Sequence, residues 1–148
     1  MAHSSGKITV YLETSTKRTF AGALDWPGWS RSGRDEASAL QALCDYGSRY
    51  GHVLRTARLA FLAPADPSAF AVLERLEGNS TTDFGAPGIP PASDSRPVDP
   101  VELQRFQKLL EAYWLAFDAA VKSAMGKTLR TGALSQAGWL RQDGPATA

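Results

Sequence analysis

Apolar and polar residues alternate at the start of the chain. Residues 8–13, ITVYLE, place three aliphatic side chains on one side and Thr9, Tyr11 and Glu13 on the other. Successive side chains of a strand point to opposite faces, so this alternation predicts a half-buried strand. A short polar loop follows, and the pattern of residues 18–26 predicts a second strand.

The motif WPGW at residues 26–29 predicts a tight reversal after the second strand. Proline presets the backbone angle needed at the second position of a type II turn. Glycine supplies the positive φ needed at the third position. Residues 29–32 are then expected to form a short third strand.

A helix is predicted over residues 35–57, because Ser32 or Asp35 can cap its start and apolar residues recur at spacings of three and four. That face consists of Leu40, Leu43, Cys44, Gly47, Tyr50 and Leu54. Residues 59–62 form a short apolar run before Pro64 and predict another strand. Residues 69–77, AFAVLERLE, are compatible with a short helix or with a strand that completes the sheet, and we favour the strand.

Composition changes at residue 78. Residues 78–98 consist largely of Gly, Pro, Ser, Thr and Asp, which predicts a linker or an excursion over the surface that Phe84 and Ile89 could hold in place. Residues 99–126 then predict a long amphipathic helix. Asp99 and Glu102 form a capping box there, with proline at the first helical position.

This helix carries an apolar stripe that we expect to face the sheet, and Leu109, Trp114 and Val121 widen it. The stripe consists of Leu103, Phe106, Leu110, Tyr113, Phe117, Ala120 and Ala124. At ~1.5 Å per residue, the helix is longer than a small sheet, so we expect part of its apolar surface to meet another chain or segment. Residues 127–148 show no pattern and are expected to be a disordered tail.

Together, these elements predict an α+β fold. A three- or four-stranded antiparallel sheet with one helix on a face occupies residues 7–77, and the long helix follows the linker. The chain has 148 residues, of which 43% are hydrophobic and 21% charged, with a net charge of +1. This composition favours a soluble globular domain and implies no global attraction to nucleic acid or to an anionic membrane.

Candidate metal ligands and targeting signals are few. Cys44 is the single cysteine, and the histidines are His3 and His52, so we expect no metal site and no cofactor. Cys44 lies on the apolar helix face and is expected to be a structural thiol. The N-terminus has no signal-peptide core, and no run approaches the ~18 apolar residues of a membrane span. We therefore expect a cytoplasmic protein without membrane contact.

The most site-like cluster in the sequence combines Trp26, Trp29, Arg31 and Arg34. Aromatic and arginine side chains can stack on a partner's side chains or on nucleic-acid bases. The same residues can also form a turn in which both tryptophans are buried and the arginines are solvated. Both interpretations stay open from the sequence, and the first assigns these four residues to partner binding.

An alternative site is a small-molecule pocket between the sheet and the long helix. Tyr113, Trp114 and Phe117 would line it, and Glu13 or Asp25 would act as general base. Glu13 and Asp25 fall on neighbouring predicted strands, but two carboxylates are too few for two-metal nuclease chemistry.

The stretch FAGALDWPGWSRSGRDEASALQAL, in residues 20–43, resembles the N-terminal module of the HicB-type antitoxins. The shared features are the Pro27-Gly28 turn, a second glycine at Gly33, and a helix that opens at Glu36-Ala37. The resemblance covers about residues 7–62 and implies a β-β-β-α-β arrangement, which is a reduced ribonuclease H-like α+β module without nuclease activity. In those antitoxins, the module covers a small toxin that acts on RNA.

The resemblance favours a non-enzymatic protein-interaction module of toxin–antitoxin type. We expect a homodimer with a small protein partner, whose contacts lie on the tryptophan edge and on the long helix. A small-molecule-binding protein or enzyme is the alternative hypothesis, and nucleic-acid binding at the aromatic, basic edge is the third.

Overall fold

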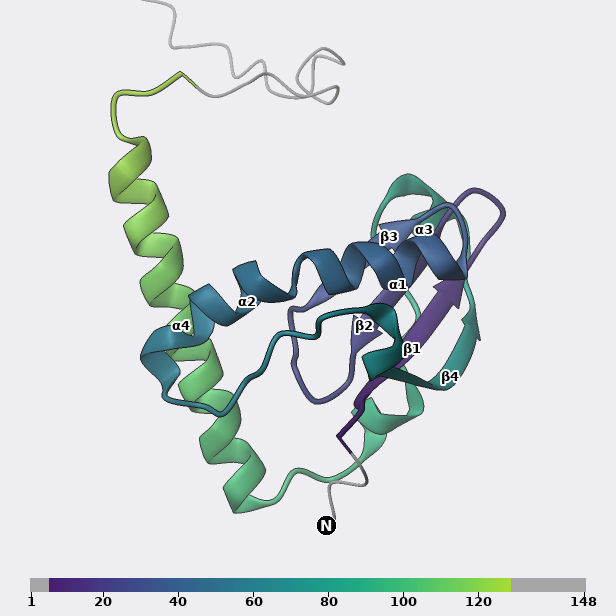
Figure 1. Cartoon of the computed structure of the whole chain (residues 1–148), viewed down its shortest axis with the longest axis horizontal. Coiled ribbons are helices and arrows are strands. Elements are labelled where there is room, and N and C mark those ends of the chain that lie inside the picture. The colour runs from purple at the N-terminus through teal and green to yellow at the C-terminus, as the bar shows by residue number, and fades with distance from the viewer. Residues whose placement is uncertain (1–5, 129–148) are drawn as a thin grey trace, which may run out of the picture. The chain divides into compact units, whose positions relative to one another are not determined.

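The computed structural model describes residues 6–128, and the chain divides into two compact units, one ending at Ala116 and one beginning at Phe117. The fold is α+β, as the sequence predicts, with a four-stranded sheet and a long C-terminal helix (Figure 1). In chain order, the elements are β1 (Ile8–Thr14), β2 (Thr19–Ala23), β3 (Ser30–Gly33), α1 (Glu36–Asp45), α2 (Gly47–Val53), η1 (Leu54–Ala57), η2 (Pro67–Ala69), β4 (Phe70–Glu77), α3 (Ser80–Phe84), η3 (Ala92–Ser95) and α4 (Pro100–Ala124).

The strand order in the sheet is β3-β2-β1-β4. β2 pairs antiparallel with both β1 and β3, whereas β4 pairs in parallel with β1. The sheet is therefore mixed, and the expectation of a purely antiparallel sheet is corrected. Parallel neighbours need a long crossover connection, which the helical segment before β4 supplies. The register shifts between Val10 and Tyr11, which leaves Leu73 of β4 as the extra residue of a bulge.

The two strands predicted after the first helix have different outcomes. Residues 69–77 do contain a strand, β4, whereas residues 59–62 form none. Phe61 donates its amide hydrogen to the Leu59 carbonyl at 2.9 Å, so the backbone bends locally instead of pairing with a strand. Both sides of β1 are already occupied by β2 and β4. The apolar residues of this run instead pack by their side chains against the core.

The predicted first helix is interrupted. α1 ends at Asp45, and α2 begins at Gly47, after Tyr46. A Cβ atom at Gly47 would lie 3.0 Å from the Pro64 ring and 3.3 Å from the Trp29 indole, so glycine permits this close approach.

One face of the sheet is covered by α1. Val10 and Leu12 of β1 are fully buried there, together with Ala39 and Leu43 of α1. Asp35 caps α1 as predicted, because its side chain accepts a hydrogen bond from the Ser38 amide at 2.8 Å. This side is an ordinary apolar core between a sheet and a helix.

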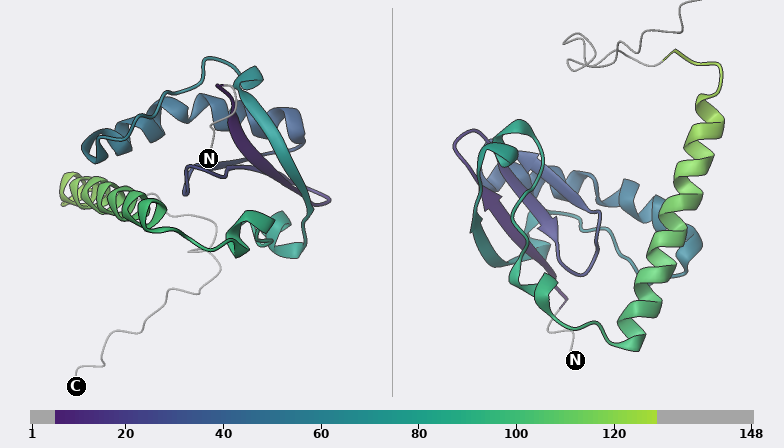
Figure 2. Two further views of the ribbon diagram at one scale, coloured as in Figure 1. Left: turned by 90° about the horizontal axis from the view of Figure 1, so that it is seen from below. Right: turned by 180° about the vertical axis from the view of Figure 1, so that it is seen from behind.

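The segment from residue 78 to residue 98 covers the opposite face of the sheet. It contains α3 and η3, and Figure 2 shows it in front of the sheet when the molecule is viewed from behind. Of the two interpretations of this stretch, the linker is wrong, and the excursion over the surface describes the segment. The disordered tail predicted for residues 127–148 lies, from residue 129 onward, outside the described residues.

Candidate functional site

The WPGW motif forms the predicted turn. The Trp29 amide donates to the Trp26 carbonyl at 3.1 Å, and Gly28 has the positive φ, 85°, that the third position of the turn requires. The turn joins β2 to β3 and places its two indoles in different environments.

Trp29 lies inside the core, with only 1% of its surface exposed. Its indole Nε1 donates to the Leu43 carbonyl at 3.0 Å, and its ring stacks on Tyr50 at 5.5 Å. Edge-to-face contacts with Phe61 and Phe70 complete its surroundings. The assignment of Trp29 to a partner surface is therefore wrong, because a buried indole cannot reach another molecule.

Trp26 is half-buried and forms part of the surface on which α4 packs. Its ring meets Phe61 edge-on at 4.9 Å, and the Arg105 guanidinium of α4 lies 4.5 Å from its centroid. Arg105 also donates a hydrogen bond to the Asp25 carbonyl. The exposed indole face thus binds a cation of the same chain.

Two tyrosine hydroxyls fix α4 to the turn. The Tyr113 hydroxyl donates to the Pro27 carbonyl, and the Tyr50 hydroxyl lies within hydrogen-bond distance of both, 2.6 Å from the Tyr113 oxygen and 3.0 Å from the Pro27 oxygen. Burial raises the pKa of both phenols, and for Tyr50 the hydrogen bond with Tyr113 adds to the rise. The turn of the WPGW motif therefore serves primarily as a contact with α4 of the same chain.

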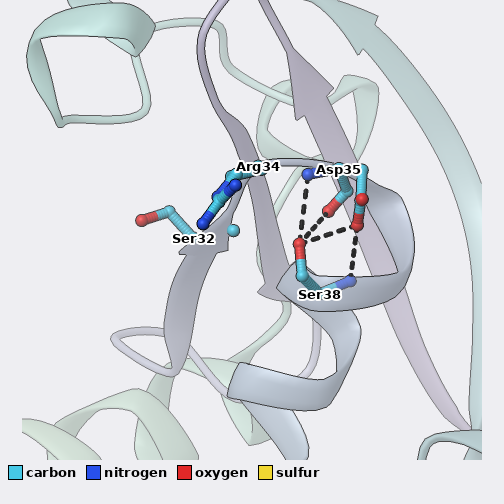
Figure 3. A pocket seen from close by; sticks show the side chains of 5 residues that line it. Ser32, Arg34, Asp35 and Ser38 are labelled. Atoms are coloured by element: carbon cyan, nitrogen blue, oxygen red, sulfur yellow. Dashed lines mark hydrogen bonds between the residues drawn. The ribbon is translucent and has the colours of Figure 1, made fainter.

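The two arginines of the predicted cluster, Arg31 and Arg34, have different surroundings. The Arg31 guanidinium stacks on the Tyr46 ring, 3.2 Å from its centroid, whereas Arg34 is exposed. Arg34 lines a shallow depression of about 520 Å³ beside the start of α1. Figure 3 shows its side chain pointing away from the hydrogen bonds that join Asp35 and Ser38. Those bonds cap α1 and lower the pKa of Asp35.

Glu13 has a structural role that its sequence position did not reveal. Its side chain is fully buried and accepts hydrogen bonds from the Thr82 hydroxyl at 2.5 Å, from the Gly88 amide at 2.9 Å and from the Ile89 amide at 3.0 Å. One carboxylate of β1 thus holds the segment that covers this face of the sheet.

The structure does not bring the residues of the alternative pocket together. The oxygens of Glu13 are occupied by segment 78–98, and the Tyr113 hydroxyl by Tyr50 and Pro27. Asp25 is exposed and accepts a hydrogen bond from Thr9 at 2.9 Å. Trp114 and Phe117 are exposed by 59% and 58%. The proposed pairing of a general base with this aromatic lining is therefore wrong.

α4 turns a different face to the module than the sequence predicts. Leu109 and Ala112 are its buried residues, whereas Leu103 and Leu110 of the predicted inner stripe are exposed by 53% and 56%. The helix therefore has a second apolar side. Its signal in the sequence is the width of the apolar surface, since Leu109, Trp114 and Val121 widen the predicted stripe beyond the single face of an ordinary surface helix.

Among residues 6–128, no group of three or more His, Cys, Asp or Glu side chains is placed to hold a metal ion. Cys44 is buried, and its burial raises the pKa of the thiol, which suits a structural residue. No helix in the described range is long and apolar enough to cross a bilayer. Comparison with known protein families, curated proteins and solved structures gave no match.

Proposed function

We propose that the chain is a HicB-like, non-enzymatic protein-interaction module that associates with a second copy of itself through α4. The observation that carries this proposal is the exposed apolar row on α4, here called the outer row. It consists of Leu103, Gln107, Leu110 and Trp114. The tryptophan edge, by contrast, is largely occupied by α4 itself.

The spacing of the outer row favours a helical partner. Its members are separated alternately by four and three residues, which is the heptad repeat of helices that pack along each other. Leu103 and Leu110 lie one heptad apart and both expose more than half of their surface. Exposed leucines at this spacing indicate an interface, whereas a solvated helix face carries polar residues there.

The polar member of the row, Gln107, favours a second copy over an unrelated helix. In a parallel pair of identical helices, Gln107 meets Gln107, and each amide can both donate and accept a hydrogen bond. A single polar residue in an apolar heptad row specifies register in this way. The row contains no charged residue, so self-association brings no like charges into contact.

The test is the molar mass of the full chain in solution, measured by light scattering and sedimentation. We expect twice the 15.9 kDa of one chain at micromolar concentration. The double variant Leu103→Glu/Leu110→Glu should be a monomer, because four carboxylates would then face one another in the dimer. Leu115→Glu is the matched control on the same helix, where Leu115 is also exposed by 56% but lies outside the row.

Two outcomes contradict the proposal. One is a wild-type chain that stays monomeric at high concentration, and the other is a double variant that remains folded and dimeric. A chain truncated after Thr128 tests whether the outer row is occupied by a second copy or by the chain's own last twenty residues. We expect this truncated chain to dimerise like the full one. A dimer that forms only after truncation would assign the row to the C-terminal segment.

A further inference from the structure

The outward side of α2 and η1 is strongly cationic. Residues 46–65 contain three arginines, no lysine and no carboxylate, so this stretch carries a charge of +3 in a chain whose net charge is +1. Arg49, His52 and Arg55 follow one another at intervals of three residues and are all exposed. At this spacing, they form one row along the helical segment.

Arg58 continues this basic row in a conformation that arginine rarely adopts. Its φ is 53°, and within the described residues it is the only non-glycine residue with a positive φ. Glycine is the favoured residue at such a position after a helix. The presence of arginine there suggests that the guanidinium itself is used.

Arg58 lies beside a second cation from α4. Together with Thr56, Lys108 and Glu111, it lines a depression of about 250 Å³ between η1 and α4. At the other end of the row, Arg49 and Arg31 approach the Tyr46 ring at 5.3 and 3.2 Å, which restricts both guanidinium groups. We name the set Arg31, Arg49, His52, Arg55, Arg58 and Lys108 the basic ridge.

The charges of the basic ridge are not neutralised within the described part of the chain. The ion pairs among residues 6–128 are Arg75–Glu36 and Arg96–Glu102, and neither involves the ridge. The single carboxylate at the second depression is that of Glu111. The ridge therefore presents an excess of hydrogen-bond donors with positive charge.

We infer that the basic ridge binds the phosphate backbone of a nucleic acid. Arginine matches the geometry of phosphate oxygens, and the hydroxyls of Ser48 and Thr56 on the same segment are further donors. A protein partner would call for apolar residues at the centre of the contact, and the outward positions of α2 and η1 are polar instead. Contacts of this kind recognise charge and spacing without reading sequence.

The experiment measures fluorescence anisotropy of a labelled 24-residue DNA, single-stranded and duplex, with the full chain at several salt concentrations. We expect binding in the micromolar range at 50 mM salt. The logarithm of the binding constant should fall with that of the salt concentration with a slope of about −4 for duplex DNA, as expected for four to five neutralised phosphates. Scrambling the DNA sequence should leave the binding constant unchanged.

The triple variant Arg49→Gln/Arg55→Gln/Arg58→Gln should bind at least tenfold more weakly and lose about three units of that slope. Its matched control, Lys7→Gln/Lys17→Gln/Arg34→Gln, removes the same charge from exposed residues elsewhere and should bind within about threefold of wild type. Arg58→Gly separates binding from folding, because glycine relieves the backbone at this position. We expect it to melt at or above the wild-type temperature and still bind more weakly.

Several outcomes would overturn this inference. Equal losses in the triple variant and its control would show attraction to total charge only. Displacement of the DNA by polyglutamate at equal charge concentration would assign the ridge to an acidic polypeptide. Absence of binding at 50 mM salt and 100 µM protein would remove the proposal, while leaving the proposed association through α4 unaffected.

Discussion

The two faces of the sheet are covered by different physical means. On one face, α1 covers an apolar core to which Val10 and Leu12 of β1 belong. On the other face, segment 78–98, which has little regular structure, is held by hydrogen bonds to the buried carboxylate of Glu13. The first cover follows from the hydrophobic effect, and the second depends on hydrogen bonds, of which the buried ones go to Glu13, about seventy positions earlier in the chain. Exposed bonds join Asp83 to Thr16 and Lys17, and Ala92 to Glu74.

The difference shows that one polar side chain of a strand, here Glu13, can be as buried as the apolar side chains of the opposite face. Thr9, Tyr11 and Glu13 alternate with the aliphatic residues of β1, a pattern that normally indicates a solvated face. Tyr11 lies against Gly22 of β2, where a Cβ atom would come within 2.3 Å of its ring. Burial and the nearby Glu13 raise the pKa of its phenol.

The largest expected effect comes from breaking the apolar face. Trp29→Ala removes a stacked, hydrogen-bonded indole from the core and should lower the free energy of unfolding by about 3–5 kcal/mol. Chemical denaturation followed by circular dichroism measures this loss. Trp26→Ala is the control from the same turn, and it should cost only about 1–2 kcal/mol because Trp26 is half-buried. Equal losses would contradict the different environments of the two indoles.

The polar face is tested by Glu13→Gln. The amide group presents donors of its own to Thr82, Gly88 and Ile89, so we expect a loss of about 3 kcal/mol. Hydrogen exchange of the Gly88 and Ile89 amides should accelerate more than exchange in α1. Glu77→Gln makes the same chemical change at an exposed position at the end of β4 and should have little effect. Unchanged exchange at residues 88 and 89 would show that the carboxylate does not hold the segment.

The smallest effect is expected at the contact between the WPGW turn and α4. Tyr113→Phe removes one hydroxyl, while the Tyr50 hydroxyl keeps its bond to Pro27 at 3.0 Å, so the loss should be about 1 kcal/mol.

The hydrogen-bonded pair of Tyr50 and Tyr113 also predicts that the stability of the fold depends on pH. The folded-state pKa of Tyr50 and that of Tyr113 are raised above 10.0, so the folded chain keeps protons that the unfolded chain releases. Their stabilising contribution is complete at neutral pH and decreases as the pH rises above about 10. Melting temperatures between pH 7 and 11 should fall less steeply in Tyr113→Phe than in wild type. Identical slopes would count against the tyrosine pair as the source of this dependence.

Local physical chemistry accounts for the predictions that are confirmed. The alternation of residues 8–13, the WPGW turn, the Asp35 cap of α1 and the capped start of α4 each depend on residues within one or two turns of each other. The predictions that are wrong concern longer distances. Whether residues 59–62 pair with a strand depends on the neighbours that β1 already has.

The sequence by itself determined where most elements lie, how the chain reverses at Pro27-Gly28, and that α4 is apolar on more than one side. Only the tertiary structure decided that Trp29 is internal, that Glu13 holds segment 78–98, and that Leu109 of α4 faces the core while Leu103 and Leu110 face outward. The physical reason is that backbone propensities and caps act between neighbours in sequence. Burial and the partners of polar groups, in contrast, depend on which distant segments meet.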